Sequence, residues 1–236
     1  MNRSIAIFGA VCALAFGTVT HAAEQWVAGR HYNLITPAQR TSVPAGKIEV
    51  AEIFSYGCPF CAQILPVMGR LKASLPANAQ LVYIPASYIP NEDWPMFQRA
   101  FFTAQAMGIM EKTHEAMFNA VWKTGELSVS DSVTHRLKSP LPSIEDAAKF
   151  YARTAGIKEA DFIATSKSFG VDAKMRGADG FILMTQALST PTFIVNGKYR
   201  LDAQTAGNYD NVIALINYLV KQESAVASGK PAKTAR

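Results

Sequence analysis

The fold follows from one stretch of the sequence, which reads Ile48-Glu49-Val50-Ala51-Glu52-Ile53-Phe54-Ser55-Tyr56-Gly57-Cys58-Pro59-Phe60-Cys61. Its first half, through Phe54, is mostly apolar and predicts a buried strand. The next three residues form a short turn. The segment from Cys58 onward predicts a packed helix, because apolar side chains recur along it at Ala62, Ile64, Leu65, Val67, Met68 and Leu71. The stretch therefore predicts a strand, a tight turn and a helix that opens on a Cys-x-x-Cys motif.

The spacing of Cys58 and Cys61 predicts disulfide chemistry. Two thiols so placed can close a small disulfide ring and pass it to another protein. The ring is reactive when the first thiol is acidic, and a helix N-terminus makes a thiol acidic. The only other cysteine is Cys12, in an N-terminal segment that we expect to be removed. An exported protein that used disulfides for its own stability would spread its cysteines along the chain.

Two other readings of the motif are weaker. Structural zinc needs four ligands, usually a second Cys or His pair at short spacing. The chain has no second Cys pair, and its four histidines are scattered at His21, His31, His114 and His135, so no metal is expected. A purely structural disulfide would close too short a loop to restrict the unfolded chain much.

The N-terminus predicts a cleaved secretory signal over residues 1–23. Arg3 supplies the positive charge, and the apolar core from Ile5 to Phe16 is too short to span a bilayer. Ala22 and Ala23 offer cleavage positions. The alternatives are a buried first helix or a membrane anchor. Export would place the chain in an oxidising compartment, where disulfides persist.

Composition limits the partners and the size of the fold. The formal net charge is +5, and no basic stripe is interleaved with aromatic residues, so nucleic acid is not expected as a partner. No second apolar run is long enough for a membrane span. After cleavage about 213 residues remain, enough for one large domain or for a domain with an insertion.

Further elements are predicted along the chain. A second strand over 81–85 should lie parallel to the first, because right-handed crossovers join parallel neighbours. Residues 91–188 show helical patterns and few strand signals. Asn196-Gly197 predicts a hairpin turn between strands at 192–195 and 198–201. A last helix is expected from the spacing of Val212, Leu215, Ile216 and Leu219. Residues 223–236 read as a disordered basic tail.

This architecture resembles the thioredoxin superfamily and, more narrowly, the DsbA-type periplasmic thiol oxidoreductases. The resemblance covers nearly the whole chain after the signal. It rests on three segments: Glu52 to Cys61, Ala104-Gln105-Ala106-Met107-Gly108, and Thr190-Pro191-Thr192-Phe193-Ile194-Val195-Asn196-Gly197-Lys198-Tyr199. It implies an α/β thioredoxin fold with an inserted helical domain. The thioredoxin-like halves would be residues 24–90 and 189–222, and the insertion residues 91–188.

The resemblance also implies roles for single residues. Cys58 matches the exposed nucleophilic cysteine, and Cys61 matches its buried partner. Pro191, after Thr190, matches a cis-proline that faces the disulfide and helps to bind substrate. Glu52 occupies the position of a buried acid, where a raised pKa would let it relay a proton to or from Cys61. A strand-end carboxylate with a structural partner is the other reading of Glu52.

Two positions depart from the family pattern. Phe60 stands where histidine is frequent, so Phe60 and Pro59, between the cysteines, are expected to tune the pair towards a somewhat weaker oxidant. Thr190 replaces a frequent valine, and threonine there is seen in disulfide isomerases.

The resemblance implies a periplasmic thiol:disulfide oxidase without a cofactor. It would act as a monomer on reduced exported proteins and be reoxidised by a DsbB-type membrane partner. A disulfide isomerase or reductase is the alternative enzyme. A non-catalytic chaperone or a protein that binds a soft metal at the Cys pair is a further alternative.

Overall fold

The computed structural model describes residues 26–227. The predicted signal over 1–23 lies outside these residues. The strands are β1 (Asn33–Leu34), β2 (Ile48–Phe54), β3 (Ala79–Pro85), β4 (Thr192–Val195) and β5 (Tyr199–Leu201). The helices are α1 (Pro59–Gln63), α2 (Leu65–Ser74), the 3₁₀ turn η1 (Pro90–Glu92), α3 (Trp94–Ala106), α4 (Met110–Trp122), α5 (Ile144–Ala155), α6 (Glu159–Ser166), α7 (Phe169–Thr185), α8 (Ala203–Ala206) and α9 (Tyr209–Ala227).

The five strands form one sheet in the order β1-β5-β4-β2-β3. β2 and β3 are parallel, as predicted, and Glu52 is opposite Tyr83. β4 joins the other edge of β2 in the antiparallel sense, with Glu52 opposite Phe193. All seven residues of β2 are buried because the strand has a partner on each edge and helices on each face. The predicted Asn196-Gly197 hairpin is confirmed, with positive φ at both residues.

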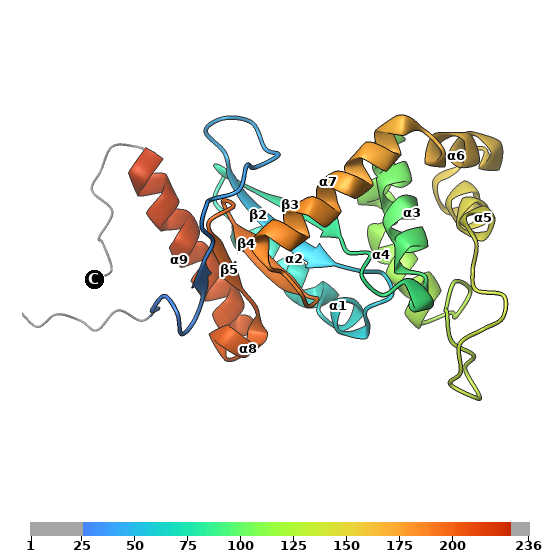
Figure 1. Ribbon diagram of the computed structural model, residues 1–236, viewed down its shortest axis with the longest axis horizontal. Coiled ribbons are helices and arrows are strands. Elements are labelled where there is room, and N and C mark those ends of the chain that lie inside the picture. The colour runs from blue at the N-terminus through green and yellow to red at the C-terminus, as the bar shows by residue number, and fades with distance from the viewer. Residues whose placement is uncertain (1–25, 228–236) are drawn as a thin grey trace, which may run out of the picture.

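Helices cover both faces of the sheet (Figure 1). On one face, Val50 and Val195 share a core cluster with residues of α2 and α9, such as Leu71 and Leu215. On the other face, Ile53 shares a second core cluster with residues of α7 and of the inserted helices. α7 runs from those helices back to the sheet, so it joins the two parts of the chain (Figure 1).

The segment between β3 and β4 is helical and stands beside the sheet (Figure 1). Phe97, Phe101 and Ala104 recur at i, i+4 and i+7 and share one buried face of α3. Ser143 closes a capping box at the start of α5, and Gly156 ends that helix at positive φ. Between residues 26 and 227 no helix is both long enough and apolar enough to cross a membrane.

The helix predicted from Cys58 onward is confirmed. It is divided at Ile64 into α1 and α2, because Pro66 lacks the N–H that would continue the hydrogen-bond ladder. The boundary predicted at residue 223 is wrong, because residues 223–227 belong to α9, which runs to Ala227. Glu223 is buried there and accepts hydrogen bonds from Asn196, Lys198 and Tyr199 of the hairpin. The remaining tail, 228–236, lies outside the described residues.

Candidate active site

The turn after β2 places Cys58 at the N-cap of α1. Its Sγ accepts a hydrogen bond from the backbone N–H of Cys61 at 3.4 Å. The pKa of Cys58 is lowered to about 6, first by the hydrogen bond from the Cys61 thiol and further by the Thr190 side chain and the backbone N–H groups of Cys61 and Phe60; burial opposes this. A thiolate is therefore favoured at this helix start.

Cys58 is less accessible than the exposed cysteine that the resemblance implied. Only 3% of the residue is exposed. The reason is that the Thr190 carbonyl lies 3.4 Å from its sulfur on one side and the first turn of α1 lies on the other.

Cys61 lies one helical turn further on and is buried, as expected. Burial raises the pKa of its thiol well above the ordinary value, and its hydrogen bond to Cys58 and the nearby Glu52 act in the same direction. At neutral pH the reduced pair therefore holds one thiolate, on Cys58, and one thiol, on Cys61. Both cysteines are free thiols in this structure.

Glu52 lies on β2, six residues before Cys58, and is 3% exposed. Burial, and secondarily the negative charge of Cys58, raise the pKa of its carboxyl group to about 8, which confirms the predicted direction. Between residues 26 and 227 no protein group forms a hydrogen bond with this carboxyl group. The carboxyl group is protonated at neutral pH.

The loop before β4 faces the cysteines. The Thr190–Pro191 peptide bond is cis, as predicted. The Thr192 hydroxyl donates to the Ser189 carbonyl at 2.8 Å and so ties the two ends of the loop together. This loop directs the Thr190 carbonyl at Cys58.

Three exposed apolar or aromatic residues lie on segments next to the cysteines, and we call them the apolar rim: Phe60, Tyr88 and Leu188. Phe60 is 59% exposed on α1, and Leu188 is 72% exposed just before Thr190. Tyr88 comes from the loop after β3 and packs on Trp94 with ring centroids 5.3 Å apart. Sequence reasoning missed Tyr88, because nothing in its loop shows a pattern. Burial, and secondarily the charges of Cys61 and Cys58, raise the pKa of Tyr88 to about 12, against a hydrogen bond with the Thr190 side chain.

A second group of residues missed by the sequence holds the turn before Cys58. The Tyr56 hydroxyl is 2.9 Å from His114 Nδ1, and Trp122 Nε1 donates to the Tyr56 carbonyl at 2.8 Å. Both partners come from α4. Burial lowers the pKa of His114 to about 3, so this imidazole is neutral. In the described part of the chain no cluster of His, Cys, Asp and Glu could hold a metal ion.

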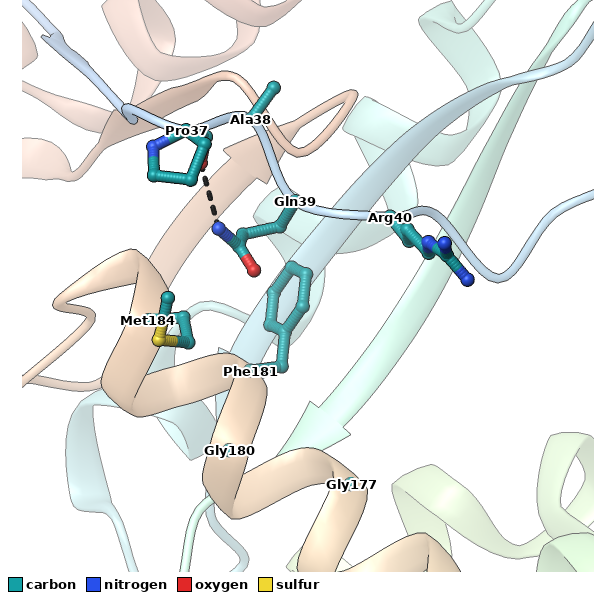
Figure 2. A pocket seen from close by; sticks show the side chains of 8 residues that line it. All are labelled: Pro37, Ala38, Gln39, Arg40, Gly177, Gly180, Phe181 and Met184. Atoms are coloured by element: carbon teal, nitrogen blue, oxygen red, sulfur yellow. Dashed lines mark hydrogen bonds between the residues drawn. The ribbon is translucent and has the colours of Figure 1, made fainter.

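Two surface pockets lie near the helices. One, of about 440 Å³, is formed by residues 37–40 against α7, where Phe181 and Met184 face the loop (Figure 2). The other, of about 460 Å³, lies between α4 and the helices that follow Cys58, and Pro66 and Trp122 line it. Neither is lined by the cysteines.

Comparison with known proteins identifies the family. No protein-family model matches the chain. The thiol:disulfide interchange protein DsbA of Pseudomonas syringae is 34% identical over 227 residues, which cover 96% of this chain and 98% of that protein. The chain belongs to the DsbA family. The crystal structure of Pseudomonas aeruginosa DsbA superposes with a TM-score of 0.73 at 32% identity and covers 87% of this chain and 98% of that one.

A DsbA member is a thiol:disulfide oxidoreductase, and the site has the parts for that chemistry. The fold is the thioredoxin fold with an inserted helical domain, as predicted. A more distant structure, a Proteus mirabilis DsbA variant at 19% identity with a TM-score of 0.61, holds a non-covalently bound peptide. That likeness shows the shared fold alone.

Proposed function

We propose that this chain is a periplasmic oxidase that donates the Cys58–Cys61 disulfide to exported proteins. The observation that carries the proposal is that the two thiol pKa values shift in opposite directions: the pKa of Cys58 is lowered and the pKa of Cys61 is raised. Stabilising the Cys58 thiolate stabilises the reduced pair. A dithiol that is stable in its reduced form makes a disulfide that oxidises other thiols.

The reaction takes two exchanges. A substrate thiolate attacks Cys58 Sγ, a substrate–Cys58 bond forms, and the Cys58–Cys61 bond breaks with its electron pair on Cys61. A second substrate thiolate then attacks the substrate sulfur of this mixed disulfide, and Cys58 leaves as a stabilised thiolate. The substrate is oxidised by two electrons and the cysteine pair is reduced by two.

Glu52 supplies the proton that Cys61 needs. Cys61 is an unfavourable thiolate because it is buried, so it must take up a proton as it leaves. Glu52 is protonated at neutral pH and close enough to Cys61 for its charge to affect that thiol. Proton transfer between them neutralises the leaving group, and reoxidation runs the transfer in reverse.

Substrates bind at the apolar rim and at the Thr190–Pro191 loop. Reduced exported proteins expose apolar segments, and Phe60 and Leu188 offer such segments a large exposed apolar surface. Pro59 and Phe60, between the cysteines, tune the redox properties of the pair. The protein acts as a monomer after removal of residues 1–23, needs no cofactor, and is reoxidised by a membrane partner of the DsbB type.

The equilibrium of the purified protein with glutathione redox buffers tests this function. We expect a reduction potential well above the value of about −270 mV that holds for thioredoxin. A value near or below that of thioredoxin would mean a reductase or a structural disulfide. An isomerase would show itself by rearranging scrambled disulfides faster than it oxidises a reduced substrate. The Cys61→Ser variant, which cannot form the ring, is the control.

A further inference from the structure

The backbone before Cys58 forms a β-turn. The N–H of Cys58 donates to the Ser55 carbonyl at 3.0 Å, which closes a four-residue turn. The Tyr56–Gly57 peptide lies at its centre. Such a peptide can rotate as a unit and exchange one turn type for another, and the rotated form requires positive φ at the third residue.

Gly57 is the third residue, and its close approach to Trp94 requires it to be glycine. A Cβ added at Gly57 would lie 2.6 Å from Trp94 Nε1, which no side chain tolerates. Gly57 is not among the glycines of positive φ in this structure. Glycine also adopts positive φ at no steric cost. The glycine that the contact with Trp94 requires at position 57 therefore also makes the rotated turn accessible. This freedom lies directly beside the reactive cysteine.

Two hydrogen bonds hold the central peptide in place. Trp122 Nε1 donates to the Tyr56 carbonyl at 2.8 Å, and the Gly57 N–H donates to Ser55 Oγ at 3.1 Å. Rotation of the peptide would turn both of its polar groups away from these partners. Ser55 is local to the turn, whereas Trp122 reaches it from α4 in the inserted helices.

We propose that Trp122 is a positioning residue that fixes the Tyr56–Gly57 peptide and thereby the reactivity of Cys58. The indole does not touch the sulfur. It holds the chain so that Cys58 enters α1 with its Sγ on the N–H of Cys61, the contact that helps to stabilise the thiolate. Trp122 is 42% exposed at the edge of the 460 Å³ pocket, so the restraint acts from the surface. The inserted helices therefore set the state of the cysteine as well as adjoining it.

The Trp122→Phe variant tests this proposal, since it removes the donor and keeps an aromatic ring. We expect the Cys58 thiolate to titrate about half a pH unit higher, measured by absorbance of the reduced protein at 240 nm, and alkylation by iodoacetamide at pH 5 to slow about threefold, because the thiolate is the reactive form. Trp26→Phe is the matched control, because Trp26 belongs to the core cluster of α2 and α9. We expect it to leave both values unchanged.

The Ser55→Ala variant releases the same peptide from its other end. We expect it to raise the pH at which the Cys58 thiolate forms as well. The change in the double variant should differ from the sum of the changes in the two single variants, because both residues restrain one peptide unit. Far-UV circular dichroism checks that each variant is folded, and Ser55→Ala carries the test alone if Trp122→Phe is not. If folded Trp122→Phe has the same thiolate titration and the same alkylation rate as the wild type, the proposal is overturned. The proposal takes the role of the thiolate from the proposed function, but these readouts need no substrate, so the two fail separately.

Discussion

Replacing Glu52 with glutamine should stabilise the protein at neutral pH. The carboxyl group has a pKa of about 8 in the folded chain against 4.5 ordinarily, chiefly because it is buried. In the unfolded chain it ionises above pH 4.5, so unfolding releases a proton that the folded state retains. Stability from this group therefore falls as pH rises from about 4.5 to about 8. Glutamine has no such proton to lose.

The size of the effect follows from the two pKa values. Each pKa unit corresponds to about 1.4 kcal/mol, so the penalty at pH 7 is about 3 kcal/mol and at pH 4 is close to zero. The variant should therefore exceed the wild type in free energy of unfolding by about 3 kcal/mol at pH 7 and by little at pH 4. The gain should be smaller in the oxidised protein, because the negative charge of Cys58 is then absent.

Urea denaturation followed by far-UV circular dichroism measures this difference. Wild type and Glu52→Gln are compared at pH 4 and pH 7, each fully reduced. Glu49→Gln is a matched control, because Glu49 is a buried carboxyl group on the same strand that accepts hydrogen bonds from Ser42. We expect this control to lose stability. A Glu52→Gln variant that is less stable than wild type at pH 7 would refute the reasoning and favour a structural role for the carboxylate.

Three further outcomes are expected. The Phe60→His variant should lower the Cys58 pKa below the wild-type value of about 6 and raise the reduction potential, since an imidazolium beside the sulfur favours the thiolate; a titration at 240 nm that shows no decrease contradicts this. Cys61→Ser should accumulate mixed disulfides with disulfide-bonded substrates on non-reducing gels, because the Cys58 thiolate attacks the substrate disulfide, one substrate sulfur leaves as a thiolate, and no Cys61 thiol remains to release the product. Cys58→Ser should not accumulate them, and equal accumulation in both variants would mean that Cys58 is not the reacting sulfur. Glu223→Ala should cost about 2 kcal/mol of unfolding free energy at pH 7, because it leaves three donors unpaired. The Glu223 pKa is lowered by Lys198 and its other donors, so this loss should shrink as urea denaturation is repeated below pH 4, and an unchanged loss would speak against the ion pair.

Local patterns carried most of the fold prediction. The apolar run of β2 is buried along its whole length, and Asn196-Gly197 forms the predicted turn. Both outcomes depend on neighbours in sequence. The position of the cysteine pair at a helix start is equally local, because it follows directly from the strand and turn before it.

Contacts between distant segments could not be predicted in this way. His114 and Trp122 show no motif, and they meet the turn before Cys58 only because α4 packs beside it. Tyr88 likewise shows no motif, and it packs on Trp94 of α3. The prediction for the end of α9 was wrong for a related reason. Glu223 is polar, which is typical of a tail, but its partners are Asn196, Lys198 and Tyr199 in the hairpin more than twenty residues earlier. A single sequence does not show which remote donors satisfy a buried carboxylate.

The position of β4 has a consequence for the newly made chain. β4 lies between β5 and β2 in the sheet, yet it begins at Thr192, about 140 residues after β2. A polypeptide is released with its N-terminus first. One edge of β2 therefore stays unpaired, and Cys58 lacks the Thr190 loop, until nearly the whole chain has been released. Open strand edges invite pairing with other chains. The last fifth of the protein thus completes the sheet and the catalytic centre together, and a chain cut short before Thr192 should aggregate without acquiring activity.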